Sequence, residues 1–303
     1  MSNLYDVLII GGGPGGYTAA LYCARAGIKA LVLEKLAPGG QMATTGDIDN
    51  YPGFEEGVDG FELGDKMRRQ AERFGAETLL TEVTAVDLAA EPKTVTTTGG
   101  EFRGRAVIVA TGAYPRLLGL PNENELRGRG VTYCATCDGM MYRGKEVAVV
   151  GGGNSAVADA LVLAKLCKKV TLIHRLDTLR ASKVYHDARP DSGVEIRWNS
   201  KVTEFLFDQR LKGVKLADTV TGEESVLPCE GLFIAAGRVP DTELFRGQLE
   251  MDEAGYLLAD ETTRTNIPGV YAVGDVRQKP LRQIVTATAD GAVAAHFIEE
   301  YLI

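Results

Sequence analysis

The chain has 303 residues, long enough for two domains of ordinary size, and is 45% hydrophobic and 24% charged. Its net charge of −8 disfavours a nucleic-acid partner, because phosphate binding requires a basic surface. No apolar run approaches the about 20 residues of a membrane-spanning helix. The five cysteines are not spaced like those of a small secreted domain held together by disulfides. No basic segment typical of a signal peptide precedes the first apolar run. We therefore expect a cytoplasmic protein.

The first predicted element is a buried parallel strand followed by a glycine-rich turn and a helix. Residues 6–20 read DVLIIGGGPGGYTAA, with an apolar run suited to a strand covered on both faces. Gly11 allows the tight turn, Gly13 lets the backbone approach a pyrophosphate, and Gly16 permits close helix–strand packing. Glu34 ends the next predicted strand, where a carboxylate can accept both ribose hydroxyls of an unphosphorylated adenosine. This pattern predicts an FAD site.

A cysteine pair follows in the stretch VTYCATCDG at residues 131–139. A zinc site would need two more ligands at suitable spacing, and the sequence offers none. Two alternatives remain, a structural pair and a redox dithiol in which one thiolate attacks a disulfide and its neighbour resolves the intermediate. Asp138 directly follows Cys137 and is either a proton donor to a departing thiolate or an ordinary turn residue. We favour the redox interpretation, because a nucleotide motif comes next.

That motif repeats the first one at an offset of 140 residues. Residues 146–160 read EVAVVGGGNSAVADA, and TLIH at 171–174 aligns with LVLE at 31–34. Gly151, Gly153 and Ala156 take the roles of the three earlier glycines. One such motif is weak evidence, but two glycine-rich turns without ligands would leave the repeat unexplained.

The second copy ends in HRLDTLR where the first ends in Glu34. The guanidinium groups of Arg175 and Arg180 can bind a 2′-phosphate, which a carboxylate would repel. The alternative is that these arginines are merely solvent-exposed side chains at the end of a strand. We expect NADPH at this second site.

Near the C-terminus, TNIPGVYAVGD predicts a turn and a short strand that ends at Gly274 and Asp275. Ligands of open α/β sheets lie off the carboxyl ends of strands, so Asp275 is either a ligand contact or a helix N-cap.

The repeat predicts an α/β fold with two Rossmann-like dinucleotide-binding domains, the second inserted in the first. Two segments rich in glycine, proline and charge, 114–130 and 237–248, are candidate crossings between them. Residues 1–115 and 245–303 would form the FAD-binding domain, and 116–244 the NAD(P)H-binding domain with the cysteine pair. Two neighbouring crossings make a hinge, so we expect relative rotation.

The chain closely resembles the bacterial-type, low-molecular-weight thioredoxin reductases along its whole length. The resemblance rests on motifs that occur in the same order: CATCDG ahead of VAVVGGGNSA, then HR…R, then TNIPGVYAVGD…RQ. The resemblance implies a homodimer with one FAD and one active disulfide per subunit, and an NADPH domain that swings. It implies that Cys137 faces the flavin, that Cys134 attacks the disulfide of thioredoxin or a thioredoxin-like protein, and that Asp138 is the acid/base.

The motifs and the resemblance together give two sets of candidate cofactor contacts. Those for FAD are Gly11, Gly13, Pro14, Gly16, Glu34, Gly40, Gln41, Asn50, Thr111, Gly112, Gly274, Asp275, Arg282 and Gln283. Those for NADPH are Gly151, Gly153, Asn154, Ser155, Ala156, His174, Arg175 and Arg180. The family's phosphate clamp usually reads His-Arg-Arg followed by a third arginine, and here Leu176 replaces the middle one of the three arginines. NADH use or relaxed specificity therefore stays open.

Four other functions share parts of this sequence pattern. A reductase for another redoxin stays open. The flavoprotein component of a peroxide-reducing system would carry an added N-terminal redox domain, which we do not expect in this chain. A reductase that takes its electrons from ferredoxin would lack the second glycine motif, which is present at Gly151–Ala156. A non-enzymatic flavin-binding protein would not need the cysteine pair.

Overall fold

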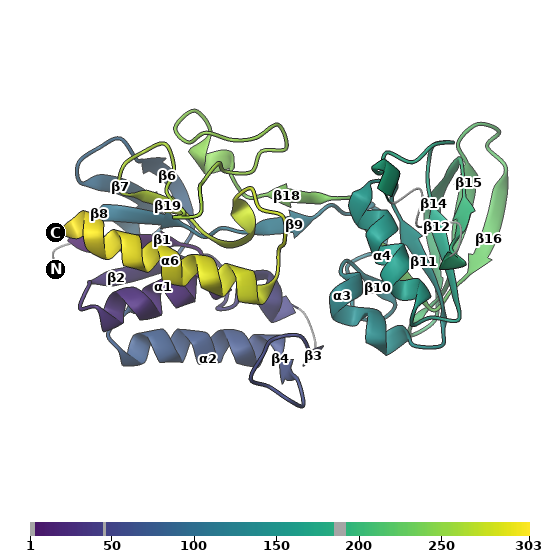
Figure 1. Ribbon diagram of the computed structural model, residues 1–303, viewed down its shortest axis with the longest axis horizontal. Helices are drawn as coiled ribbons and strands as arrows, with labels where there is room; N and C mark the ends of the chain where they lie inside the picture. The colour runs from purple at the N-terminus through teal and green to yellow at the C-terminus, as the bar shows by residue number, and fades with distance from the viewer. Residues whose placement is uncertain (1–3, 45–46, 185–191) are drawn as a thin grey trace. The chain divides into compact units, whose positions relative to one another are not determined.

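The computed structural model describes residues 4–44, 47–184 and 192–303, and it has an α/β fold (Figure 1). The chain divides into two compact units, Met1–Tyr114 with Val239–Ile303 and Pro115–Arg238. The sequence places the second crossing within 237–248, and the chain re-enters unit 1 at Val239. None of the helices in the described ranges is long and apolar enough to cross a membrane.

Unit 1 is built on a seven-stranded sheet in the order β5-β2-β1-β8-β7-β6, with β19 also paired to β8. Its strands are β1 (Leu4–Ile10), β2 (Ala30–Glu34), β5 (Glu77–Leu80), β6 (Val83–Asp87), β7 (Lys93–Thr97), β8 (Gly100–Val109) and β19 (Val270–Ala272). Strands β5, β2, β1, β8 and β19 pair in parallel, whereas β7 pairs antiparallel with both β6 and β8.

Three helices pack on one side of this sheet, as Figure 1 shows: α1 (Pro14–Arg25), α2 (Gly60–Arg73) and α6 (Ile284–Leu302). Because side chains alternate along a strand, Val7 and Ile9 of β1 join the core under the helices. Leu8 and Ile10 join a second core with Phe245 on the opposite face. Both faces of β1 are therefore covered, as its unbroken apolar run predicts.

Unit 1 also contains short elements outside this sheet and these helices. They are η1 (Gly40–Thr44), β3 (Asp47–Ile48), β4 (Val58–Asp59), η4 (Glu243–Phe245) and η5 (Gly274–Val276). Helices α1 and α6 cross closely because Gly291 of α6 has no side chain. A Cβ at this position would lie 2.3 Å from the carbonyl oxygen of Gly15. The start of α1 is thereby held beside α6.

Unit 2 contains a five-stranded parallel sheet in the order β10-β17-β11-β12-β13 and an antiparallel sheet β14-β15-β16. The strands are β10 (Val131–Thr132), β11 (Glu146–Val150), β12 (Lys169–Ile173), β13 (Glu195–Arg197), β14 (Ser200–Phe207), β15 (Leu211–Asp218), β16 (Glu224–Pro228) and β17 (Gly231–Ile234). The helices of unit 2 that the structure describes in full are α3 (Ala135–Asp138), η2 (Gly139–Tyr142) and α4 (Asn154–Ala164).

The cores of unit 2 follow the same alternation. Val147 and Val149 of β11 pack with Val157 and Leu163 of α4, and Ala148 packs on the other face with residues of β14 and β15. The crossing segments β9 (Ala113–Pro115) and β18 (Arg238–Pro240) pair as a two-stranded ladder.

Candidate active site: two glycine loops and a cysteine pair

The first glycine loop joins β1 to α1 and is built so that only glycine fits at two of its positions. Gly11 has φ +107°, and a Cβ there would lie 2.4 Å from the carbonyl oxygen of Ala110. A Cβ on Gly16 would lie 2.0 Å from the carbonyl oxygen of Gly11. The helix starts at Pro14 with Gly13 as N-cap and no side-chain cap, so its first N–H groups can bind an anion.

The space beside this helix start is open. A Cβ on Gly13 would meet no atom within 4 Å, whereas one on Gly40 would lie 3.4 Å from the Cα of Gly13. The N–H of Gly39 donates to the carbonyl oxygen of Gly12 at 2.8 Å, which fixes η1, with Gly40 and Gln41, against the loop. The result is a cradle of backbone that fits the pyrophosphate of a dinucleotide.

Glu34 links the end of β2 to the same loop. Its carboxylate is buried, and Oε2 accepts the N–H of Gly12 at 2.6 Å while Oε1 accepts the N–H of Leu36 at 3.0 Å. Each oxygen of a carboxylate has a second lone pair, so the group can still accept hydroxyl donors.

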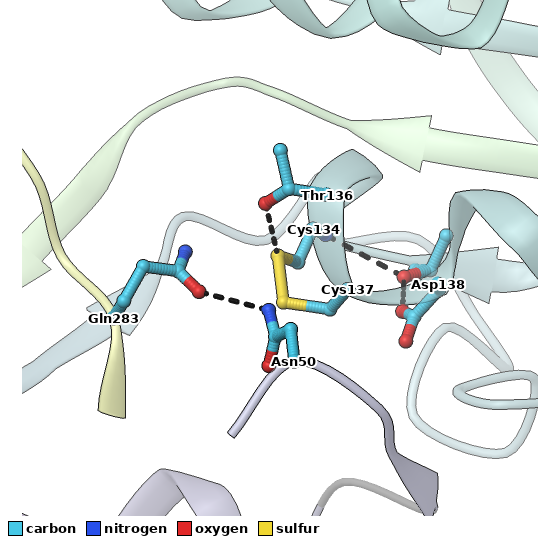
Figure 2. Close-up of a disulfide and its surroundings, with 7 residues drawn as sticks. Asn50, Cys134, Thr136, Cys137, Asp138 and Gln283 are labelled. Carbon is cyan, nitrogen blue, oxygen red and sulfur yellow. Dashed lines mark hydrogen bonds between the residues drawn. A yellow bond between two sulfur atoms is a disulfide. The ribbon is translucent and has the colours of Figure 1, made fainter. Parts of the chain in front are cut away.

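The remaining candidate FAD contacts lie in unit 1 in the loop before α2, in the turn after β8, and between β19 and α6. Thr111 donates from Oγ1 to the carbonyl oxygen of Asp241 at 2.6 Å, and Gly112 follows with φ +77°. Nδ2 of Asn50 donates to Oε1 of Gln283 at 3.1 Å (Figure 2), which joins the loop before α2 to the N-cap of α6.

Gly274 and Asp275 are the first two residues of η5, which follows β19 after Val273 and lies beside the start of α1. The guanidinium of Arg282 donates from Nε to the carbonyl oxygen of Asp275 at 3.4 Å and lies 3.9 Å over the ring of Tyr256. Arg282 thus closes the loop that carries Asp275.

Sequence reasoning missed a buried charged cluster in this region, formed by Arg277, Lys279 and Asp290. Both cations pair with the carboxylate of Asp290. One signal was available, because Asp290 is the only charged residue among the first fifteen of α6, where small and apolar side chains prevail.

The second glycine loop joins β11 to α4 with the same design. A Cβ on Gly151 would lie 2.6 Å from the carbonyl oxygen of Ala235 and 2.6 Å from the Cβ of Ala156. A Cβ on Gly153 would meet nothing within 4 Å, and α4 begins at Asn154 without a side-chain cap. Ser155 is exposed in the first turn.

Asn154 and Arg180 tie the chain after β12 to this second loop. Oδ1 of Asn154 accepts the N–H of Ser182 at 2.7 Å, and the N–H of Arg180 donates to the carbonyl oxygen of Gly152 at 2.8 Å. The second contact repeats the bond between Gly39 and Gly12 in unit 1. The backbone cradle is therefore present twice.

His174 lies beneath this second loop, with only 3% of its surface exposed. Its Nε2 is 2.9 Å from the carbonyl oxygen of Thr178, and its Cε1 lies 2.0 Å from where a Cβ of Gly152 would be. Arg175, Leu176 and Arg180 are exposed on the segment that follows.

Cys134 and Cys137 form a disulfide at the start of α3, with Cα atoms 5.3 Å apart (Figure 2). Thr136 Oγ1 lies 3.4 Å from the sulfur of Cys134. The other three cysteines are free, and burial raises the pKa of the Cys23 and Cys229 thiols to about 12. Burial also raises the pKa of the Cys167 thiol, which is partly exposed. None of the three free cysteines therefore has a thiolate favoured by its surroundings, and thiolate chemistry is expected of the Cys134–Cys137 pair once it is reduced.

Asp138 ends α3 one residue after the disulfide. Its carboxylate accepts a hydrogen bond from the Thr132 hydroxyl. Burial raises the pKa of Asp138 above its ordinary value, although the bond from Thr132 works in the opposite direction. A carboxyl of this kind stays protonated to higher pH than an exposed one, which suits a proton donor. Thr132 was not among the residues expected from the sequence.

Comparison with known proteins agrees with this geometry. The family model described as pyridine nucleotide-disulphide oxidoreductase matches residues 5–291. A thioredoxin reductase of Streptomyces coelicolor is 51% identical over 306 residues, covering 100% of this chain and 95% of the relative. One from Bacillus subtilis is 44% identical, covering 99% and 95%.

Two solved structures are similar over the whole chain. The thioredoxin reductase of Streptococcus pyogenes has a TM-score of 0.93 at 41% identity, covering 100% of this chain and 99% of its own. That of Giardia duodenalis has a TM-score of 0.92 at 36% identity, covering 99% of each. The chain therefore belongs to the pyridine nucleotide-disulphide oxidoreductase family, among the thioredoxin reductases.

Proposed function

We propose that this enzyme reduces the disulfide of thioredoxin, or of a thioredoxin-like protein, with electrons from NADPH that pass through FAD and the Cys134–Cys137 pair. The observation that carries this proposal is the disulfide at the start of α3, in the same unit as the second glycine loop. Two nucleotide cradles and one cysteine couple are the parts that such a transfer requires.

The residues of unit 1 fit FAD. The uncapped start of α1 would hold the pyrophosphate, and Glu34 would accept the adenosine ribose hydroxyls. The other contacts proposed are Gly11, Gly13, Pro14, Gly16, Gly40, Gln41, Asn50, Thr111, Gly112, Gly274, Asp275, Arg282 and Gln283. Bound FAD would supply the conversion of a hydride into an electron pair that a disulfide can accept, which no side chain can perform.

The residues of unit 2 fit a nicotinamide dinucleotide. Gly151, Gly153 and the first turn of α4, from Asn154 to Ala156, would hold the pyrophosphate. Arg175 and Arg180 are exposed and would bind the 2′-phosphate of NADPH. His174 would act indirectly, because its buried ring supports the backbone of Gly152. Relaxed discrimination against NADH is the alternative, and Leu176 between the two arginines favours it.

The cysteine pair would perform the exchange with thioredoxin. The Cys134 thiolate attacks one sulfur of the thioredoxin disulfide, and the other sulfur leaves as a thiolate that takes a proton from Asp138. The Cys137 thiolate then attacks Cys134 in the mixed disulfide. This step restores the Cys134–Cys137 bond and releases thioredoxin with both sulfurs reduced, so two electrons have moved.

We assign residues 1–115 and 245–303 to the FAD-binding domain and 116–244 to the NAD(P)H-binding domain. The paired crossings β9 and β18 support a hinge between them. A homodimer and a cytoplasmic setting complete the proposal. The latter is supported by the three cysteines that remain free, because an oxidising compartment favours pairing.

A Cys134→Ser variant tests the proposed function. Flavin bleaching by NADPH should persist, and thioredoxin turnover should fall to background, because serine cannot attack a disulfide. Cys167→Ser is the matched control, since Cys167 is a free cysteine of the same unit and should be replaceable without loss. Turnover of thioredoxin by Cys134→Ser at the parent rate would contradict the proposal.

A further inference from the structure

Asp290 of α6 is the centre of a buried charged cluster to which the chemistry above gives no role. Its Oδ1 lies 3.0 Å from Nη1 of Arg277, and its Oδ2 lies 2.6 Å from Nζ of Lys279. The three side chains are only 8% (Arg277), 6% (Lys279) and 12% (Asp290) exposed. One buried carboxylate therefore neutralises two cations incompletely, an arrangement that requires close placement of all three groups.

The same carboxylate also binds the backbone of the turn that carries Asp275. Oδ2 of Asp290 accepts the N–H of Gly274 at 2.9 Å. Gly274 has φ +75°, so this turn adopts a backbone conformation that few residues tolerate. The bond joins the carboxyl end of β19, one residue before Asp275, to the second turn of α6.

Two further contacts close the segment onto itself and onto the helix. Nζ of Lys279 also donates to the carbonyl oxygen of Thr286 at 3.1 Å, in the first turn of α6. Arg282 donates to the carbonyl oxygens of Asp275 and Arg277. Residues 274–282 are thus fixed at their start, middle and end, and Asp290 makes three of the bonds, to Gly274, Arg277 and Lys279.

We propose that Asp290 is a positioning residue for FAD, which acts by holding Gly274 and Asp275 in the conformation that binds the cofactor. This inference rests on the proposed function, in which Asp275 contacts FAD. Removal of the carboxylate leaves two buried cations side by side without a counter-ion. Their repulsion displaces the segment that carries Asp275, and FAD affinity falls.

The test measures the affinity of the apoprotein for FAD from the quenching of flavin fluorescence on binding. D290N keeps the size of the side chain and should weaken FAD binding at least tenfold. E300Q is the matched control, because Glu300 lies on the same helix in an exposed pair with Arg264 at 3.5 Å. It should bind FAD within twofold of the parent. Thermal unfolding of each apoprotein shows whether the variants are folded.

K279M separates charge balance from simple structural support. It leaves Arg277 paired with Asp290 and should weaken FAD binding less than D290N does. The double variant K279M/D290N removes one of the two repelling cations and should bind FAD more tightly than D290N alone. A merely structural role would give a double variant no better than D290N, and that result would overturn the inference.

The remaining outcomes are also decisive. D290N apoprotein that is folded and binds FAD within twofold of the parent would overturn the inference. If D290N does not fold, the double variant decides: affinity equal to that of K279M overturns the inference, and weaker affinity supports it. Failure of the parent apoprotein to bind FAD at all would instead refute the proposed function.

Discussion

Replacement of Leu176 by arginine should raise the preference of the enzyme for NADPH over NADH. Leu176 is 42% exposed and lies between Arg175 and Arg180, the two residues proposed to bind the 2′-phosphate. Its backbone is held independently of its side chain, because its carbonyl oxygen accepts the N–H of Asn199 at 3.2 Å. Such a surface substitution should change the free energy of unfolding by no more than about 0.5 kcal/mol.

The size of the effect follows from the exposure of the segment. A hydrogen bond to a charged group contributes about 1.5–3 kcal/mol, and solvent screening favours the lower end for an exposed guanidinium. About 1.5 kcal/mol corresponds to roughly a tenfold change. We therefore expect the ratio of kcat/KM for NADPH to that for NADH to rise about tenfold, mainly through NADPH.

Steady-state kinetics with both nucleotides at low and high ionic strength measures this ratio. Leu176→Gln is the control, since it adds a polar group of similar length without charge and should change the ratio little. The arginine effect should shrink at high salt because the interaction is between charges. An unchanged ratio, or an equal gain with NADH, would refute the assignment of the 2′-phosphate to this segment.

Three other substitutions have defined outcomes. Asp138→Asn should slow thioredoxin turnover by roughly 10²-fold. It should also remove the fall in rate that occurs in the parent as rising pH deprotonates Asp138. A parent-like pH profile would exclude Asp138 as the proton donor. Asp159 lies on α4, and burial raises its pKa to about 6. The native state therefore binds this proton more tightly than the unfolded chain does, and the free energy of unfolding falls as pH rises from about 4 to about 6. Asp159→Asn should remove that fall and stabilise the protein at pH 7 by about 3 kcal/mol in urea unfolding. Equal stability would show that the carboxylate is well solvated. Gly16→Ala should abolish FAD retention on gel filtration, because the new Cβ would lie 2.0 Å from Gly11 O.

The glycine loops could be predicted because their signal is local. Gly11, Gly16 and Gly151 are required by backbone conformation and close approach, and the repeat shows that the same unit occurs twice. The disulfide bonds two cysteines only three residues apart. Their spacing left a structural pair and a redox pair open, and the resemblance to thioredoxin reductases implied the disulfide. The α/β fold follows from apolar strands that alternate with glycine-led helices.

Other features depend on tertiary contacts and could not be predicted. The ring of His174 occupies space that exists because Gly152 lacks a side chain, a relation across 22 residues of sequence. Asp290 meets Arg277 and Lys279 only because α6 returns beside η5. The antiparallel sheet β14–β16 has no glycine signature, and only the structure shows how it covers the second face of β11.

A thiol count after anaerobic reduction with NADPH tests the central claim most directly. The oxidised chain has three free cysteines, Cys23, Cys167 and Cys229, and should give three thiols after denaturation. One equivalent of NADPH beyond that consumed by the flavin should raise the count to five. Alkylation should map both new thiols to Cys134 and Cys137, and oxidised thioredoxin should remove them again. A bleached flavin with the count still at three would show that electrons do not reach the disulfide.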